Sequence, residues 1–479
     1  MSTDVSSRRG VTRRGFLTVA VSAIVAGVVA GVGAYYAGTL AAPAEVTREV
    51  TRTIERTTTV TAPPTTVTKT ITTTVTTTVA ATTPTTPTTI PTAIKIGYIH
   101  QFVGVAASEG LHEYPIIKAF IDEVNKQGGV YLKDYGRKLP IQLVVYDGES
   151  DVARNIELCT KAITEDKVCF VHSGGTPDQN IAHHTVCEKY GIPNISEYPL
   201  EIFTGEGKAR AQYWKYSWVG SFFSIPAMME GYFTVFESFV KRGLVSRKVG
   251  YLLEDNPDGH WWYDSTKSKY ESLGYEVVFP GFFPTGTKDF TGIISVLKDK
   301  RVEILHINTS ITDFPTFWRQ SIGMGYKPKI AIGGRYMGSL DDALAIGPGD
   351  TPLGLMTELW TWPIPGSTGT DWIWETYPKV TNLHMGFGVA GHMSTEQFLI
   401  KVLEEAGSVD PEKINETIPK VEARTCVGKV KYDPETHTSP GPALIGQIQK
   451  TPTGELTLQI VWSSDPAVPT VEPILIPPP

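Results

Sequence analysis

The feature that most constrains the fold of this 479-residue chain is a repeated exchange of strand and helix patterns that begins at Ile94. Short apolar segments with strand character alternate with longer segments of helical spacing as far as Ile195. The strand segments are 94–99 and runs within 136–147, 168–175 and 190–196. This alternation predicts a parallel sheet covered by helices on both faces. Ligands of such sheets bind at the carboxyl ends of the strands.

A second α/β set begins near Gly220 and predicts another lobe of the same kind. Its strands are expected at 248–253, 276–279, 302–307 and 330–334. Its helices are expected at 264–273, 290–298 and 314–324. The chain is longer than one simple core accommodates, so two lobes agree with its size.

The first 93 residues differ in character and predict a membrane-targeted tether. Thr12–Leu17 matches the twin-arginine export pattern, and Gly15–Ala44 carries no charge. We therefore expect residues 1–44 to be a twin-arginine signal that either stays as a membrane anchor or is cut after Ala44, since the apolar run is long enough to span a bilayer. Residues 45–93 are rich in Thr and predict a disordered, O-glycosylated stalk, with a β-prone linker as the alternative. The remaining chain would then lie at the extracellular face of the cell membrane.

The composition and the cysteine pattern argue against several classes of function. A net charge of −7 without a visible basic stripe argues against a nucleic-acid partner. The four cysteines match no zinc or redox spacing, so we expect free and mostly buried thiols at Cys159, Cys169, Cys187 and Cys426. A disulfide between Cys159 and Cys187 is the alternative. We expect neither a metal nor a cofactor.

The sequence also lacks the motifs of common enzyme classes. It contains no HExxH, GxSxG or Walker segment. Four histidines that could otherwise indicate catalysis are interpreted as isolated surface or structural groups: His172, His183, His184 and His260. We therefore expect a protein that is not an enzyme.

Four short segments occur in an order and spacing that resemble a known family. They are Thr287–Phe290, Arg319–Gly325, Ala406–Pro411 and Val427–Asp433. With the α/β pattern, they resemble the extracytoplasmic solute-binding proteins of ABC transporters for branched-chain amino acids and amides, which are leucine-binding-protein-like and have the type I periplasmic-binding fold. The resemblance covers about 94–462, and the anchor, stalk and head together resemble archaeal solute-binding proteins.

This resemblance implies two Rossmann-like α/β lobes with a central ligand cleft and three hinge crossings. The crossings would lie near 217–222, 355–358 and 433–440. Lobe one would comprise 94–219 and 358–433, and lobe two would comprise 220–357 and 434–465. A disordered, Pro-rich tail would follow at 466–479.

The resemblance also implies the role of substrate-binding component of an ABC importer. A monomeric head would capture a small polar solute and deliver it to a membrane permease. The solute would be a branched-chain amino acid, an amide, a urea-like compound or a small organic acid. A cell-surface sensing receptor that uses the same fold without transport is the alternative.

The candidate ligand-binding residues mostly follow the strands, where the two lobes would face each other. The loop 172–178 leads into a helix whose free amides would favour a carboxylate or a carbonyl oxygen. Asp178 either faces the ligand or caps this helix. Arg335 stands where leucine-type members carry an acid, so an arginine facing the cleft favours an acidic, amide or polar aromatic solute. Alternatively, Arg335 faces solvent or pairs with Asp258 or Asp341. The aromatic candidates either line the cleft or belong to the core. The full set is Phe102, Glu109, Ser173, Gly174, Gly175, Thr176, Asp178, Ser196, Glu197, Tyr198, Asp258, His260, Trp261, Arg335, Tyr336 and Trp360.

Overall fold

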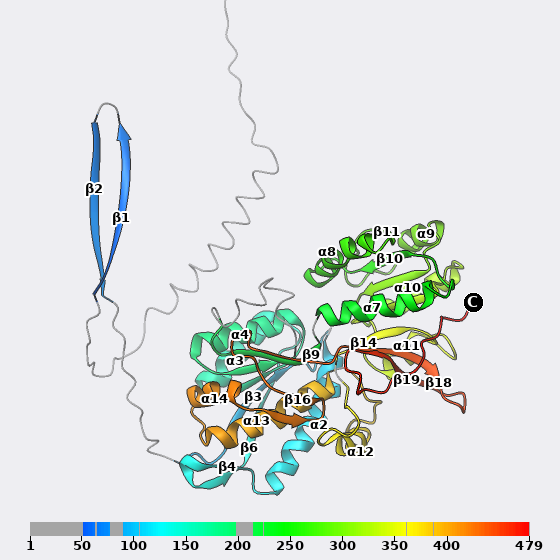
Figure 1. Ribbon diagram of the computed structural model, residues 1–479. Helices are drawn as coiled ribbons and strands as arrows, with labels where there is room; N and C mark the ends of the chain where they lie inside the picture. Colours follow the sequence, from blue (N-terminus) through cyan, green and yellow to red (C-terminus); the bar gives the residue numbers. More distant parts are fainter. Residues whose placement is uncertain are drawn as a thin grey trace, which may run out of the picture. The chain divides into compact units, whose positions relative to one another are not determined.

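The chain divides into two compact units. The computed structural model describes residues 51–62, 65–76, 90–104, 106–197, 214–223, 225–360, 362–386 and 388–478. The units are Met1–Thr89 and Ile90–Pro479, and Figure 1 draws both.

The described part of the first unit is a hairpin. β1 (Thr51–Ala62) pairs antiparallel with β2 (Thr65–Thr76). Residues 51–62 and 65–76 of the Thr-rich tract therefore have strand structure, which agrees with the preference of β-branched residues for extended backbone. The expected signal or anchor at 1–44 lies outside the described residues. Within the ranges that the structure describes, no helix is both long enough and apolar enough to cross a membrane.

Lobe one, in the second unit, is built on a six-stranded parallel sheet in the order β17-β9-β8-β7-β3-β6. Its strands are β3 (Ile94–His100), β6 (Ile141–Asp147), β7 (Phe170–Ser173), β8 (Asn194–Ser196), β9 (Ser217–Phe223) and β17 (Thr438–Gly441). Its helices are α2 (Ala107–Lys126), α3 (Val152–Thr164), α4 (Pro177–Tyr190), α12 (Thr370–Thr381), α13 (Val389–Ala406) and α14 (Pro411–Thr417). Shorter elements are β4 (Val130–Leu132), β5 (Arg137–Leu139), β15 (Ala423–Thr425), β16 (Gly428–Val430) and 3₁₀ turns at Lys133–Tyr135 and Ile418–Lys420.

Successive residues of β3 face two helical layers, because side chains alternate between the faces of a strand. Ile96 and Tyr98 belong to an apolar cluster with residues of α2 and α13. Ile99 belongs to a second cluster with residues of α3 and α4. The expected covering of both faces of the sheet by helices is confirmed (Figure 1).

Lobe two has a seven-stranded sheet in the order β11-β10-β12-β13-β14-β18-β19, and the pairs that involve β18 and β19 are antiparallel. Its strands are β10 (Lys248–Leu253), β11 (Glu276–Val278), β12 (Ile304–Asn308), β13 (Ile330–Gly334), β14 (Met356–Leu359), β18 (Leu444–Lys450) and β19 (Leu456–Ser463). Its helices are α7 (Ile225–Val240), α8 (Pro257–Ser272), α9 (Thr291–Asp299), α10 (Phe314–Gly323) and α11 (Leu340–Ile346). The strands that the sequence predicts between 248 and 334 are all present.

Helix α8 begins seven residues before its predicted start at Asp264, at Pro257. Asn256 caps this helix, since its side chain accepts a hydrogen bond from the backbone N–H of Gly259 at 2.8 Å. An Asn N-cap followed by Pro at the first helical position is a strong start signal. Asp258, His260 and Trp261 therefore lie on the first turns of a helix and not in a loop.

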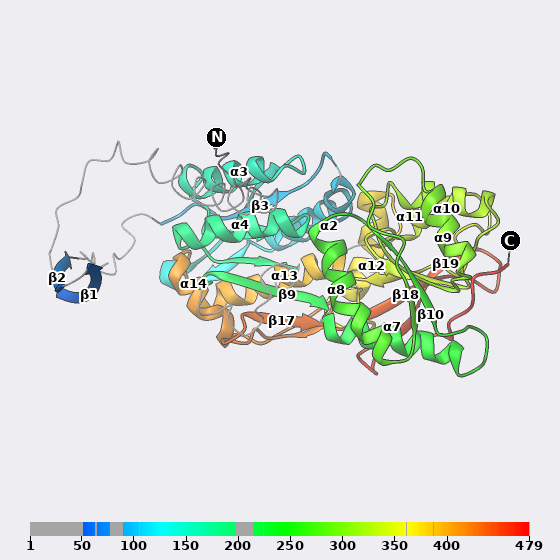
Figure 2. The same cartoon turned by 90° about the horizontal axis from the view of Figure 1, so that it is seen from above.

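The chain passes between the two sheets three times. Figure 2 shows the two lobes side by side. The crossings follow Phe223 at the end of β9, Leu359 at the end of β14 and Gly441 at the end of β17. Each crossing begins directly after the range in which the resemblance places it. Both lobes are therefore assembled from separate stretches of sequence.

The C-terminal tail is ordered against lobe two, which corrects the expectation of disorder at 466–479. Val468 and Ile476 are buried in apolar clusters of the head. The backbone N–H of Ile474 donates to the side chain of Gln447 at 2.9 Å, and that of Ile476 donates to the carbonyl of Lys329 at 2.9 Å. The prolines of the tail prevent helix formation, but the buried side chain of Ile476 provides apolar surface for docking.

All four cysteines are free and buried. The Sγ atoms of Cys159 on α3 and Cys187 on α4 lie 3.9 Å apart. The pair that the sequence names as the alternative disulfide is thus adjacent, with both thiols in the cluster beneath these two helices.

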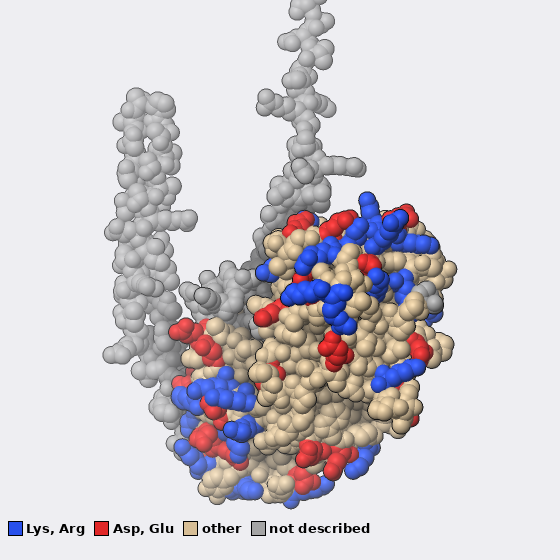
Figure 3. All heavy atoms as spheres, turned by 45° about the vertical axis from the view of Figure 1, so that its right-hand side comes forward, with Lys and Arg blue, Asp and Glu red and all other residues tan. Residues whose placement is uncertain are grey.

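The charged side chains on the face drawn in Figure 3 occur in groups of mixed sign, separated by uncharged surface. Several exposed charges of the head are paired, such as Arg247 with Glu237 at 2.6 Å and Lys450 with Asp350 at 2.6 Å. Exposed pairs of this kind contribute roughly 0–1 kcal/mol to stability.

Candidate ligand-binding cleft

A small cavity lies where the carboxyl ends of the lobe-one strands meet the second crossing. Its lining residues are Glu109, Glu113, Ser173, Gly174, Gly175, Asn180, Glu197, Trp360, Gly388 and His392. Trp360 follows β14 of lobe two, and the other lining residues belong to lobe one. The room in the cavity is about 10 Å³, which is about enough for one water molecule. A solute of amino-acid size therefore requires the lobes to open or side chains to move.

The loop between β7 and α4 forms one wall of the cavity, and its two glycines are required by close packing. A Cβ atom on Gly174 would lie 2.2 Å from the ring of His100, and Gly175 has a φ of +103°. Thr176 then caps α4, where its backbone N–H donates to the side chain of Gln179 at 2.8 Å. Asn180, on the same turn, donates to the carbonyl of Gly175 at 2.7 Å. Its Oδ1 accepts no hydrogen bond from the described residues, so it offers a solute a buried acceptor.

The positive charge of Arg335 in lobe two acts on the carboxyl group of Glu109 on α2, which lines the cavity. Burial raises the pKa of Glu109 to about 8, the nearby Glu113 adds to the rise, and the positive charge of Arg335 opposes it. At neutral pH the Glu109 carboxyl therefore holds a proton for most of the time. The charge of Arg335 also acts on Asp178, an exposed residue in the first turn of α4.

Arg335 follows β13 and has a φ of +68°. Its Nη1 donates to Oδ2 of Asp258 at 3.3 Å, and the Nδ2 of Asn308 donates to the same oxygen at 3.1 Å. One of the pairings that the sequence left open for Arg335 is thus present. The side chain of Arg335 is 24% exposed and that of Asp258 is 10% exposed, so this ion pair is largely shielded from solvent.

Several candidate residues do not line the cavity. Tyr336 is a core residue of lobe two, because its ring is buried against Phe314 and its hydroxyl donates to the carbonyl of Met356. His260 pairs with Asp255 at 2.8 Å and stacks on Phe282.

The remaining candidates contact other parts of their own lobes. Ser196 is buried against His184, with 2.9 Å between its Oγ and Nε2. Phe102 and Trp261 are half-buried and pack against the apolar clusters of lobes one and two. Tyr198 lies outside the described residues.

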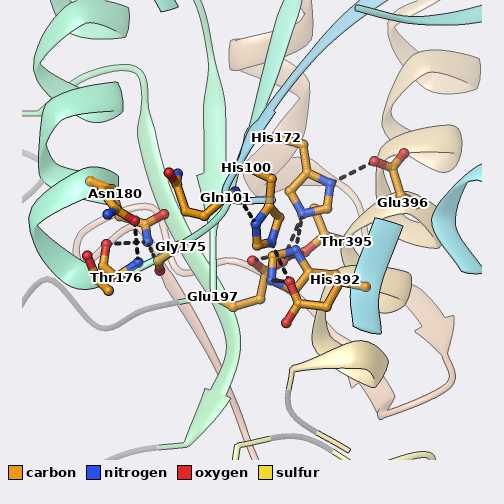
Figure 4. A network of polar contacts seen from close by, with 12 residues as sticks. His100, Gln101, His172, Gly175, Thr176, Asn180, Glu197, His392, Thr395 and Glu396 are labelled. Carbon is orange, nitrogen blue, oxygen red and sulfur yellow. Dashed lines mark hydrogen bonds and ion pairs between the residues drawn. The ribbon is translucent and has the colours of Figure 1, made fainter. Parts of the chain in front are cut away.

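Below the cavity, Glu113 of α2 is buried and contacts two histidines, His100 and His392, which Figure 4 labels. Nδ1 of His100 accepts a hydrogen bond from the backbone N–H of Gln101 at 2.8 Å, so the proton of this ring lies on Nε2, which donates to Glu113 at 2.5 Å. Nε2 of His392 on α13 lies 2.9 Å from the same carboxylate oxygen. Burial raises the pKa of Glu113, but the nearby His392 and His100 lower this pKa by a larger amount. The net pKa of Glu113 therefore falls below its ordinary value.

The second half of this network joins His172 of β7 to three residues from distant segments. Nδ1 of His172 donates to Glu396 of α13 at 2.7 Å, and its Nε2 lies 3.2 Å from Glu197 and 2.8 Å from Nδ1 of His392. The hydroxyl of Thr395 donates to Glu197 at 2.7 Å. Burial lowers the pKa of His172, yet Glu197 and Glu396 raise it to about 10.

Sequence reasoning identified only part of this site. It predicted Glu109, the Ser173–Gly175 loop, Glu197 and Trp360, which the structure brings to one cavity. It missed Glu113, His100, His392 and Glu396, and it treated His172 as isolated. His100 and Glu197 each stand at or just after the end of a predicted strand, and that position was the available signal. The contribution of α13 had no local signal, because this helix returns to lobe one about 220 positions after His172.

Two α/β lobes joined by three crossings, with a cavity at the carboxyl ends of the strands, define a protein that binds a small molecule in a cleft. The family model described as "Periplasmic binding protein" matches residues 93–453. The chain therefore belongs to the periplasmic binding protein family, whose members bind solutes outside the cytoplasm and work with ABC permeases.

Individual relatives are distant in sequence but similar in fold. A Leu/Ile/Val-binding protein homolog of Brucella abortus (strain 2308) is 24% identical over 321 residues, which cover 66% of this chain and 80% of the relative. A leucine-binding protein of Thermotoga maritima has a TM-score of 0.64 at 18% identity, with 78% of this chain and 99% of that chain covered. An ABC-transporter solute-binding protein of Rhodopseudomonas palustris in complex with 3,4-dihydroxybenzoic acid has a TM-score of 0.64 at 20% identity, with 79% and 99% covered. The two structures agree with the expected fold.

Proposed function

We propose that this protein is the substrate-binding component of an ABC importer. It captures a small polar solute between its lobes and delivers it to a membrane permease without changing it chemically. The observation that carries this proposal is the cavity at the carboxyl ends of the lobe-one strands, bounded across the cleft by Trp360. Three crossings between two packed lobes provide a hinge for closure around the solute. Membership of the family supports the same role.

The solute is expected to carry a carboxylate. The amino end of α4 follows the glycine loop that lines the cavity, and the positive end of a helix dipole favours an anion or a carbonyl oxygen. Arg335 adds a permanent positive charge from the opposite lobe, whose field reaches Glu109. Trp360 provides a flat apolar wall for an aromatic or branched side chain. Leucine and 3,4-dihydroxybenzoic acid, which the names of two similar structures give, both combine a carboxylate with an apolar body.

The test is a thermal-shift and calorimetric screen of the purified chain against small carboxylic acids, amino acids, amides and sugars. Arg335→Ala should weaken binding of a carboxylate solute about 10- to 100-fold, since a hydrogen bond to a charged group contributes about 1.5–3 kcal/mol. Arg335→Lys places an equally strained residue at the same positive φ but keeps the charge, and it should lose less affinity. Arg319→Ala, at an exposed position of α10, is the matched control.

The screen also separates the two parts of the proposal. Equal affinity for Arg335→Ala and the unchanged chain would remove Arg335 from the site but leave capture intact. Silence of the folded chain across the whole panel would count against capture itself.

The N-terminal residues fit an exported and tethered head. The twin-arginine pattern at Thr12–Leu17 and the apolar run after it support export followed by retention in the membrane, and residues 45–93 would hold a monomeric head within reach of the permease. Replacing Arg13 and Arg14 by Lys should keep the protein inside the cell, as judged by fractionation. Replacing Arg8 and Arg9 by Lys is the control, and equal retention by both pairs would contradict this route.

A further inference from the structure

Ligand atoms of three buried side chains converge beneath the cavity at the spacing of a metal site. Nδ1 of His392 lies 2.8 Å from Nε2 of His172 and 3.2 Å from Oε2 of Glu197. Nε2 of His172 lies 3.2 Å from Oε1 of Glu197. Ligands about 2.05 Å from a tetrahedral Zn²⁺ ion are about 3.3 Å from each other. The three side chains therefore need to separate by only a few tenths of an ångström to hold such an ion.

The outer nitrogens of both imidazoles are already bonded to buried carboxylates. Nδ1 of His172 donates to Glu396 at 2.7 Å, and Nε2 of His392 lies 2.9 Å from Glu113. Metal-binding histidines almost always donate their other N–H to a carboxylate, a carbonyl or water, which fixes the tautomer and directs the free lone pair at the metal. Binding of a metal ion would displace the second proton of His172, which leaves Nε2 of His172 and Nδ1 of His392 as lone pairs directed towards each other and towards Glu197.

Glu197 provides a second, independent observation. It is 5% exposed, and its Oε2 accepts no hydrogen bond from the described residues. This oxygen faces Nδ1 of His392 at 3.2 Å. When Nε2 of His392 carries the proton, Nδ1 is a lone pair, so two acceptors face each other without a donor between them. A bound cation would satisfy both, whereas a proton shared by the two imidazoles would leave this oxygen unsatisfied.

The neighbouring histidine cluster is less suitable. His100, Glu113 and His392 also come close enough together for a metal. However, Nδ1 of His100 accepts a hydrogen bond from the N–H of Gln101, so the proton of the neutral ring stays on Nε2, the atom that would have to bind the ion. The tautomers therefore favour the group of His172, Glu197 and His392.

We propose that the floor of the cleft binds a divalent transition-metal ion of the Zn²⁺ class through His172, Glu197 and His392, with an open coordination position towards the cavity. Two imidazoles and one carboxylate suit such an ion, and three protein ligands leave a fourth position for an exchangeable group. Glu197 and His392 both line the cavity, so this position is reached from the cleft. Resting on the proposed function, the inference extends it: the carboxylate of the solute completes the coordination.

Metal binding is tested on the full-length chain without a histidine tag, after treatment with a chelator. Calorimetric titration with Zn²⁺ should give one tight site per chain, and Co²⁺ should give visible absorption bands of a low-coordinate site. Glu197→Gln, which keeps the shape and the bond from Thr395, should weaken Zn²⁺ binding at least about 100-fold. Glu396→Gln should weaken it about 10- to 100-fold, since it leaves the three ligands in place but removes the carboxylate that orients His172.

Two further variants locate the site. His183→Gln changes a buried histidine of the same lobe that bonds to Asn155, outside the cluster, and should leave Zn²⁺ affinity unchanged. A larger loss of affinity for His100→Gln than for His172→Gln would move the metal to the other cluster and overturn the assignment. Absence of a tight site in the unchanged folded chain would overturn it outright and identify the network as a proton-sharing one.

The solute screen, repeated with metal-free and Zn²⁺-loaded chain, distinguishes the two proposals. Carboxylate solutes should bind at least tenfold more tightly to the loaded chain. Solute binding without any metal binding would sink the metal site and leave the importer proposal standing. Metal binding with unchanged solute affinity would show that the carboxylate does not reach the open position.

Discussion

At the scale of single residues, Glu358 connects the second crossing to the core of lobe two. It is buried, and the hydroxyl of Tyr232 donates to its carboxylate. Burial raises the pKa of Glu358 from about 4.5 to about 8, the nearby Asp258 adds to the rise, and the bond from Tyr232 opposes it. Between these two pH values the folded protein holds a proton that the unfolded chain has released, so the free energy of unfolding falls as pH rises through this window.

Glu358→Gln should therefore gain stability relative to the unchanged protein as pH rises from about 4.5 to about 8. The difference should grow by up to about 1.4 kcal/mol per pH unit, because one pKa unit corresponds to that free energy. Chemical denaturation at several pH values measures it. Glu375→Gln, at an exposed position of α12, is the control for the loss of one charge. A stability difference that stays constant with pH would show that Glu358 is ionised in the folded protein.

Residue roles were the part of the site least accessible from the sequence. The position of Arg335 after a lobe-two strand was enough to place it near the cleft, and one of its predicted partners, Asp258, is present. Tyr336 is the next residue along the chain but points into the core, since the sequence does not give the direction of a side chain in a loop. The histidine network joins β3, α2, β7, α13 and the residue after β8, so no local pattern encodes it.

At the scale of elements, the start of α8 determines where Asp258 and its pair with Arg335 lie. Asn256→Ala removes the N-cap acceptor of this helix and should lower the free energy of unfolding by about 1 kcal/mol. Asn256→Ser keeps an acceptor at the cap and should lose less. Thermal or urea denaturation provides the measurement, and Ser272→Ala, at the exposed end of the same helix, is the control. If the Asn256 and Ser272 variants prove equally stable, the cap contributes nothing.

The strands of both lobes were predictable because their apolar runs are short and bounded by turn residues. The start of α8 was missed because the charged and polar residues that follow Asn256 hide the helical period. The cap signal of Asn256 and Pro257 is nevertheless present in the sequence, directly before the start of the helix.

At the scale of the whole molecule, the C-terminal tail is an integral part of lobe two. Ending the chain after Asp465 should lower the free energy of unfolding by about 2 kcal/mol or more, because burying one isoleucine side chain contributes about 1.5–3 kcal/mol. Ending it after Ile476 retains the buried Val468 and Ile476 and the backbone hydrogen bonds of Ile474 and Ile476, and it should leave stability nearly unchanged. Equal stability of the two shortened chains would mean that the tail docks without contributing to stability.

The bilobal plan itself followed from the sequence, because two α/β sets and four family-like segments specify it. The disordered tail did not, since a Pro-rich composition indicates only that a segment forms no helix and does not show whether it docks.

The three crossings also affect how the protein is made. A ribosome releases the chain from its amino end, and the lobe-one sheet includes β17, which ends at Gly441. Lobe two includes β19, which ends at Ser463, so its sheet too is incomplete until translation is almost finished. Neither half can reach its native form on a nascent chain that stops earlier, and chaperones that meet this polypeptide during synthesis encounter two unfinished sheets with open edges.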